Sequence, residues 1–189
     1  LASSAASDVY KRQSDNILKR MNRKTNRAEL SERIAKLRHE IPDIALRTSL
    51  IAGFPGETES DHEELMEFID EVEFTRLGVF TYSPENGTKA AEMDDQIPDE
   101  VKKERRDRLM ELQQEISSDL SQEQIGKVLT VMIEGKVADE NAYVGRTYMD
   151  APNVDGYIFV NTDEELMSGD FCRVKVTGAL EYDLIGELV

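Results

Sequence analysis

Hydrophobic residues recur along this chain with two different periods, and the change of period divides the sequence. Up to about residue 125, apolar positions mostly follow the three-to-four-residue spacing of amphipathic helices, interrupted by two short apolar runs. Beyond Gly126, apolar and polar residues alternate, which is the period of half-buried strands. The pattern therefore predicts an α/β region followed by an all-β region.

The first region is predicted to alternate helices with buried strands. Helices are expected over 14–23 and from Asn26 to Pro42. A third helix is expected after a cap at Thr58 or Ser60, with a buried stripe of Leu65, Phe68, Ile69 and Val72. Strands are expected over 45–52 and 76–82. Short connections between such elements indicate β/α units and a parallel sheet. Two strands alone would leave sheet edges open, so we expect this region to be a piece of a larger structure.

A long charged helix and a small barrel are predicted next. The helix, expected over 99–124, carries an apolar stripe of Val101, Leu109, Leu112, Ile116 and Leu120. Glu104 and Arg108 on it are correctly ordered for an i,i+4 ion pair. The strands are expected over 127–134, 142–149, 157–160, 170–176 and 181–188, with turns that include Glu134-Gly135 and Asp155-Gly156. Five short strands of this spacing predict a small antiparallel barrel of OB-like size.

Residues 1–13 (LASSAASDVYKRQ) have a different character from the rest. They are small, rich in Ser and Ala, and without a period. They are typical of an adapter or cloning scar, and we exclude them from the fold prediction. The alternative is a natural disordered N-terminus.

Charge and cysteine content narrow the functional classes. The 189 residues carry a net charge of −16, and residues 126–189 alone carry −7, from five Lys and Arg against 12 Asp and Glu. Since nucleic-acid affinity depends on cations, an acidic tail suits a basic protein better than naked RNA, although acidity can also serve solubility alone. The single cysteine, Cys172, excludes a disulfide framework and any multi-thiolate metal site. With no apolar run long enough to span a membrane and no signal-peptide pattern, we expect a cytoplasmic protein without a membrane partner.

The loop Gly53-Phe54-Pro55-Gly56-Glu57-Thr58 lies between a predicted strand and a predicted helix. Glycines there let the backbone approach a ligand, and a helix N-terminus offers free N–H groups. The Lys-Ser/Thr of a P-loop is missing. Taken alone, the loop is better explained as a structural turn than as a ligand-binding loop.

The residues that flank this loop make it a more specific sign of family membership. The run 47–58, followed by an acidic helix, resembles the fifth β/α unit of the radical S-adenosylmethionine methylthiotransferases, and residues 80–88 (FTYSPENGT) and 98–117 resemble later stretches of that family. The resemblance covers 14–189 and implies the last part of a radical S-adenosylmethionine (β/α) barrel over 14–97, a linker helix over 98–125 and a TRAM domain over 126–189. Residues 145–156 and 181–184 resemble the ribosomal-protein branch, the RimO type.

The resemblance also implies a chemistry. Members of this branch are transferases that add a methylthio group to the β-carbon of an aspartate in a small-subunit ribosomal protein, using S-adenosylmethionine and two 4Fe-4S clusters. The family's cluster cysteines are absent from this chain, so we expect no catalytic residue or metal ligand here, and no activity from the chain alone. Cys172 is expected to be a small buried hydrophobe, and His39 and His62 to be surface residues.

Two sets of site residues follow from the resemblance. One set would border the cofactor and comprises Arg47, Ser49, Ile51, Gly53, Phe54 and Tyr82, the first three of which share a strand face. The other would bind the basic ribosomal protein and comprises Asp150, Asp155, Glu181 and Asp183. We expect a monomer. The alternatives are a piece of a transfer-RNA adenosine methylthiotransferase and a non-catalytic TRAM binding module.

Overall fold

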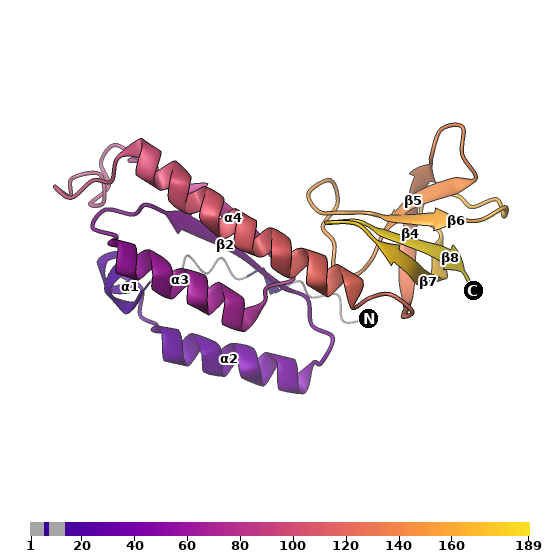
Figure 1. Ribbon diagram of the computed structural model, residues 1–189, viewed down its shortest axis with the longest axis horizontal. Helices are drawn as coiled ribbons and strands as arrows, with labels where there is room; N and C mark the ends of the chain where they lie inside the picture. Colours follow the sequence, from indigo (N-terminus) through magenta and orange to yellow (C-terminus); the bar gives the residue numbers. More distant parts are fainter. Residues whose placement is uncertain (1–5, 8–13) are drawn as a thin grey trace. The chain divides into compact units, whose positions relative to one another are not determined.

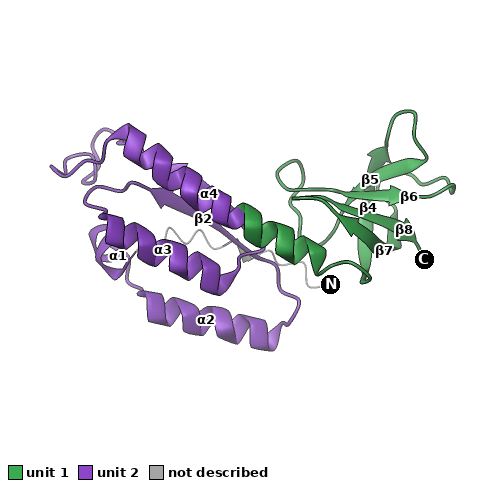
Figure 2. Cartoon of the chain, in the orientation of Figure 1, with its two compact units in different colours: residues 1–5, 114–189 green, residues 6–113 purple. Residues whose placement is uncertain are grey.

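The computed structural model describes residues 6–7 and 14–189, and the chain divides into two compact units (Figures 1 and 2). One unit is formed by residues 6–113 and the other by residues 114–189 of the described chain. The division falls within the long helix α4 (Asp99–Gln122).

Three helices precede α4 in the first unit, and each begins at a side-chain cap. They are α1 (Asp15–Arg20), α2 (Arg27–Glu40) and α3 (Glu59–Val72). The caps are Ser14, Asn26 and Thr58, whose side-chain oxygens accept N–H groups of the first turn. The predicted cap at Asn26 is confirmed, and of the two candidates for α3 it is Thr58 that caps, in a reciprocal capping box with Asp61.

The sheet of this unit is parallel, as predicted. Strand β2 (Leu46–Ala52) lies between β1 (Ala6–Ser7) and β3 (Arg76–Thr81). The two-residue strand β1 comes from the segment that the sequence analysis excluded from the fold, so that exclusion missed a strand pairing. The other residues of that segment, 1–5 and 8–13, lie outside the described part of the chain.

The two faces of β2 differ in burial. Leu46, Thr48, Leu50 and Ala52 are buried, while the residues between them are half-buried. On the buried face, Leu46 packs in one cluster with Ile34 of α2 and Phe68 of α3. Helices α2 and α3 therefore cover one face of the sheet, and the other face is left partly open.

Helix α4 has a polar buried face, which the sequence analysis did not expect. Of the predicted apolar stripe, Leu109 and Ile116 are buried, whereas Val101, Leu112 and Leu120 are only half-buried. Lys102, Arg105 and Gln113 are buried instead. Gln113 donates a hydrogen bond to the carbonyl of Phe74 (2.9 Å), so at least part of this face satisfies backbone groups of the same unit.

The second unit contains a closed five-stranded barrel (orange to yellow in Figure 1). Its strands are β4 (Val128–Lys136), β5 (Ala142–Arg146), β6 (Ile158–Asn161), β7 (Phe171–Ala179) and β8 (Leu184–Leu188), in the order β4-β5-β6-β8-β7. The core is apolar and is built from alternate positions of these strands: Val131, Ile133, Tyr143, Ile158, Val160, Val174, Val176 and Leu184.

The predicted antiparallel barrel is confirmed at four of its five strand pairs, and one predicted turn is wrong. The remaining pair, β6–β8, is parallel. Antiparallel neighbours must alternate in direction around a closed ring, so a ring with an odd number of strands requires at least one parallel pair. The predicted turn at Glu134-Gly135 is instead an irregularity within β4, where the pairing register with β5 shifts between Ile133 and Gly135.

None of the helices in the described residues is long and apolar enough to cross a membrane.

Candidate functional site

The candidate site is the loop that joins the carboxyl end of β2 to α3. Gly53 and Gly56 in this loop adopt positive φ angles of 75° and 81°, a region that side chains with a Cβ rarely enter. The N–H of Tyr82, just beyond β3, donates to the carbonyl of Ala52 (2.8 Å). The loop and Tyr82 therefore lie together at the carboxyl ends of two parallel strands, where ligands commonly bind in α/β sheets.

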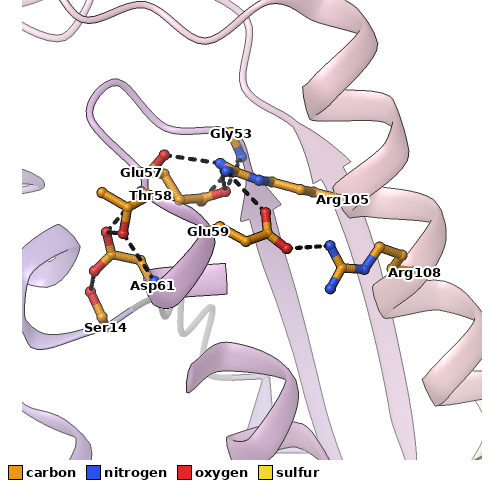
Figure 3. Close-up of polar contacts among 8 residues, drawn as sticks. All are labelled: Ser14, Gly53, Glu57, Thr58, Glu59, Asp61, Arg105 and Arg108. Carbon is orange, nitrogen blue, oxygen red and sulfur yellow. Dashed lines mark hydrogen bonds and ion pairs between the residues drawn. The ribbon is translucent and has the colours of Figure 1, made fainter. Parts of the chain in front are cut away.

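A buried ion pair holds the loop (Figure 3). The side chains of Glu57 and Arg105 are 1% and 7% exposed, and Arg105 Nη1 lies 2.9 Å from Glu57 Oε1. The same nitrogen donates to the backbone carbonyl of Glu57 (3.0 Å), and both carboxylate oxygens of Glu57 accept the N–H of Gly53 (3.1 Å). Burial raises the pKa of Glu57 above its ordinary value, against the opposing effects of Arg105 and the Gly53 N–H.

The first turn of α3 is also tied to neighbouring elements. Glu59 accepts hydrogen bonds from Arg108 and Arg105 of α4, and its pKa is lowered chiefly by the bond from Arg108. Ser14 donates to Asp61 (Figure 3). Burial opposes ionisation of Asp61, but hydrogen bonds from Ser14 and Thr58 outweigh it, and the pKa of Asp61 is lowered. The predicted partner of Arg108 was Glu104, yet its ion pair is with Glu59.

Lys102 and Tyr82 flank the glycine that begins the loop. A Cβ placed on Gly53 would lie 2.3 Å from Lys102 Cγ, so the lysine stem packs directly on the glycine backbone. Lys102 Nζ is 2.9 Å from Asp99 Oδ1 and 5.6 Å from the ring centroid of Tyr82. The Tyr82 ring in turn makes an edge-on contact with Phe54, with centroids 5.3 Å apart.

The predicted cofactor residues fall on one strand face and the adjoining loop. Arg47, Ser49 and Ile51 share the half-buried face of β2, and Gly53 and Phe54 are buried in the loop that follows. The sequence analysis missed Phe80, which is paired in register with Ile51 and is 63% exposed. Its position two residues before Tyr82 was the available signal, since alternate strand residues share a face.

Two polar atoms at this site, Arg105 Nε and the Tyr82 hydroxyl oxygen, have no hydrogen-bond partner among the described residues. The Tyr82 hydroxyl oxygen is buried and makes no hydrogen bond. A buried hydroxyl without a partner loses the hydrogen bond that water would have given it. The atom is therefore a candidate contact for a polar ligand at the carboxyl ends of β2 and β3.

His62 was predicted to be a surface residue, and this prediction is wrong. The side chain is fully buried, and neither ring nitrogen has a hydrogen-bond partner in the described structure. Burial and the charges of Arg108 and Arg105 lower its pKa to about 4, with Glu59 acting in the opposite direction. The available signal was helical spacing, because His62 precedes the buried Leu65 by three residues and Ile69 by seven. His39, by contrast, is exposed as expected.

Most of the predicted substrate-binding carboxylates hold barrel loops. Asp150 accepts from the N–H and hydroxyl of Thr147 (3.3 and 2.6 Å), and Asp155 accepts from the N–H of Ala151 (2.6 Å). Asp183 accepts from the N–H of Tyr157 (2.7 Å), which joins the loop before β6 to the loop before β8. Glu181 is the exposed member of the set. The same two loops expose large apolar side chains, those of Tyr148, Val154, Leu180 and Tyr182.

Cys172 was predicted to be a small buried hydrophobe, and it is only partly buried. It packs against the barrel core, and burial raises the pKa of its thiol. A raised pKa keeps the thiol protonated and unreactive at neutral pH.

The barrel unit matches a known domain family, and nearly the whole chain matches known proteins. The TRAM domain family matches residues 125–189, so this unit is a TRAM domain. A Lachnoclostridium phytofermentans protein named ribosomal protein uS12 methylthiotransferase RimO is 62% identical over 173 residues, which cover 92% of this chain and 39% of that protein. A protein of the same name from Clostridium botulinum (strain Langeland) is 51% identical, over 92% of this chain and 38% of its own length. Another from Pelotomaculum thermopropionicum is 49% identical, over 95% of this chain and 41% of its own length.

These matches confirm the resemblance found in the sequence. The chain is homologous to the RimO-type methylthiotransferases along nearly all of its length, and it carries a TRAM domain. It spans about two-fifths of the length of the curated relatives it matches.

Proposed function

We propose that this chain is the part of a uS12 methylthiotransferase that contributes the last strands of the catalytic barrel, one side of the S-adenosylmethionine pocket, and the substrate-binding TRAM domain. The observation that carries the proposal is the 62% identity to a protein of that name across 92% of this chain. The reaction would place a methylthio group on the β-carbon of an aspartate of the ribosomal protein, and it would take place in the cytoplasm.

The residues present fit one side of a nucleoside-binding pocket. Ile51, Gly53 and Phe54 would approach the adenine, and Tyr82 would border it with its unpaired hydroxyl. Arg47 and Ser49, on the same strand face as Ile51, are the candidates for the methionyl end. When bound in the intact enzyme, S-adenosylmethionine would supply radical chemistry at carbon. The residues of this chain would bind and orient the molecule.

The two 4Fe-4S clusters of the family do not fit this chain. Cluster ligation needs several thiolates, and the sequence contains one cysteine, half-buried against the barrel core. We therefore propose that the chain by itself does not perform the reaction.

The TRAM domain is proposed to bind the protein substrate. Its net charge of −7 over residues 126–189 complements a basic ribosomal protein and repels phosphates. Among the predicted substrate residues Glu181 is the direct candidate. Asp150, Asp155 and Asp183 would act by adding negative potential and by fixing the two loops that present it. Transfer RNA is the less favoured substrate for the same electrostatic reason.

A chimeric enzyme tests the proposal directly. Residues 14–189 of this chain would replace the matching region of the Lachnoclostridium phytofermentans protein, and reconstituted enzyme would be incubated with uS12 or with transfer RNA. We expect mass spectrometry to detect methylthiolated uS12 and unmodified RNA. Modified RNA, or an inactive chimera beside an active parent, would contradict the proposal.

A salt titration tests the role of the acidic surface. Binding of uS12 to this chain should weaken as salt is added, because exposed charges are screened over about 10 Å at 0.1 M salt. Glu181→Gln should weaken binding more than Glu164→Gln, its matched control, an exposed acidic residue outside the two loops. Binding that does not change with salt would exclude an electrostatic mechanism.

A further inference from the structure

Helix α4 places two buried cations against the proposed cofactor loop. Arg105 and Lys102 are both buried, and they lie on the face of α4 that packs within residues 6–113. Lys and Arg are almost never fully buried unless they are paired. The contacts of these two side chains therefore indicate what their burial achieves.

Arg105 is connected to Gly53 through Glu57. The guanidinium binds both the carboxylate and the backbone carbonyl of Glu57, and the carboxylate accepts the N–H of Gly53 (Figure 3). A guanidinium is a rigid planar fork, so it fixes the direction of its acceptors as well as their charge. The first and fifth residues of the loop are thereby held at a defined separation.

Stability alone is a weak reason for such a pair. The desolvation of two buried charges commonly cancels their attraction, so a buried ion pair adds little net stability compared with an apolar pair of similar volume. The loop also makes few bonds of its own: Glu57 N–H donates to Phe54 carbonyl (3.0 Å), while Gly56 N–H donates outside the loop, to Asp95 (2.9 Å). An external clamp would therefore decide which backbone conformation this glycine-containing loop adopts.

Lys102 acts on the same residues from the same helix. Its stem contacts the backbone of Gly53, and its ammonium group lies near the ring of Tyr82 while held by Asp99. Both Gly53 and Tyr82 belong to the set proposed to border the cofactor. The two cations of α4 thus converge on one end of β2 and on the tyrosine beside it.

We propose that Arg105 is a positioning residue for S-adenosylmethionine binding, acting through Glu57 to fix the Gly53–Glu57 backbone, with Lys102 supporting the same loop. The inference rests on the proposed function, which it extends to a residue that does not itself touch the cofactor. It predicts that loss of the clamp raises the KM for S-adenosylmethionine much more than it lowers kcat at saturation.

The kinetic test uses the chimeric enzyme with Arg105→Met, and Arg106→Met as the matched control. Arg106 is the next residue of α4, half-buried, and its ion pair is with Asp107 of the same helix. Arg105→Met should raise the KM for S-adenosylmethionine about tenfold or more, because the cofactor should bind with a dissociation constant about tenfold higher. The control should leave it unchanged, and equal effects of the two variants would overturn the proposal.

A double variant separates positioning from folding. Arg105→Met leaves a buried carboxylate unpaired, so it can fail to fold. Glu57→Gln/Arg105→Met removes both charges, and it should recover the unfolding midpoint while the KM stays about tenfold raised. If the double variant recovers both the midpoint and the KM, the pair serves folding alone and the proposal is wrong.

Amide exchange in the 189-residue chain gives a readout that needs no cofactor. In the Glu57→Gln/Arg105→Met variant, the Gly53 N–H should exchange about tenfold faster or more, and the Ile158 N–H of the barrel should not change. Unchanged exchange at Gly53 would overturn the clamp. The two proposals can also fail separately. If Gly53 exchanges faster in the double variant but the chimera with the unmutated sequence makes no product, the clamp is supported and the proposed function is rejected.

Discussion

The two units of this chain differ in whether their strand edges are paired. The TRAM barrel pairs each of its strands with two neighbours, so it has no free edge. In the described part of the first unit, β3 pairs with β2 alone, and the sheet face that carries Arg47, Ser49 and Ile51 is only half-buried. The barrel is structurally complete, whereas the sheet presents a face and an edge that further structure could cover.

The units differ equally in how they use charge. The barrel core is apolar, and Asp150, Asp155 and Asp183 lie in loops, where they accept backbone N–H groups. The first unit buries Glu57, Arg105, Lys102 and His62 around one loop. The comparison indicates that the barrel is organised mainly by hydrophobic burial. The loop of the sheet unit is organised by polar contacts from α4 to Glu57 of the loop and to Glu59 in the first turn of α3.

The largest expected effect is in the barrel core. Ile158→Ala removes a fully buried side chain, and it should lower the free energy of unfolding by about 4 kcal/mol. Met167→Ala, at a side chain that is 72% exposed, should change it by less than about 0.5 kcal/mol. Urea unfolding followed by circular dichroism measures both. A small effect of Ile158→Ala would contradict a barrel organised by its apolar core.

A glycine substitution tests the tight contact in the first unit. Gly53→Ala imposes both an unfavourable φ and a clash with the Lys102 stem, and it should cost about 3 kcal/mol. Gly87→Ala is the matched control, because Gly87 has a similar φ of 82° and nothing within 4 Å of its Cβ position. That control should cost only about 1 kcal/mol. Equal costs in thermal unfolding would mean that Lys102 moves away freely.

Acid should weaken the first unit before the barrel. The pKa of His62 falls from 6.5 to about 4 on folding, so between these values the unfolded chain binds more protons and stability falls as pH falls. From pH 7 to pH 5 His62 should contribute a loss of roughly 2 kcal/mol, while Glu57, whose pKa is raised by burial, acts in the opposite direction. Amide exchange in α3 should accelerate over this range, while exchange in the barrel strands should change less.

Two histidine variants assign the acid sensitivity. His62→Leu should remove most of the pH dependence between pH 7 and 5, because Leu neither titrates nor needs a hydrogen bond. His39→Leu, at the exposed histidine of α2, should retain it. An unchanged slope in His62→Leu would assign the effect to another group.

The smallest expected effect concerns the exposed ion pair between Glu59 and Arg108. Both side chains are partly in water, so Arg108→Gln should cost about 0.5 kcal/mol, and less at high salt. Urea unfolding at low and high salt measures this. A cost comparable with that of Gly53→Ala would show that the pair is part of the buried clamp.

The sequence predicted those features that depend on local pattern. Strand alternation gave the apolar positions of the barrel, and the cap at Asn26 followed from its side chain and helical context. These features depend on one residue and its near neighbours. The identity of the domain followed from motifs, and the TRAM match confirms it.

The features that sequence reasoning missed depend on long-range contacts. Arg105 and Lys102 look like surface residues of a charged helix, and only the packing of α4 on a loop some 50 positions earlier makes them buried. The role of Asp183 at Tyr157 has the same origin. The burial of His62, by contrast, was readable from its helical spacing to Leu65 and Ile69. A closed barrel of five strands requires at least one parallel pair, here β6–β8. The number of strands could be read from the sequence, but closure of the barrel could not.

Barrel closure by β8 has a consequence for synthesis on the ribosome. Leu184–Leu188 bonds to both β6 and β7, so no closed ring can form until these residues have left the exit tunnel. The sheet unit ends at residue 113 and can acquire its native contacts earlier, since domains generally fold as units in the order of their synthesis. During that interval the unpaired edges of β6 and β7 are exposed to other nascent chains. A ribosome stalled shortly before Leu184 would therefore hold an aggregation-prone intermediate.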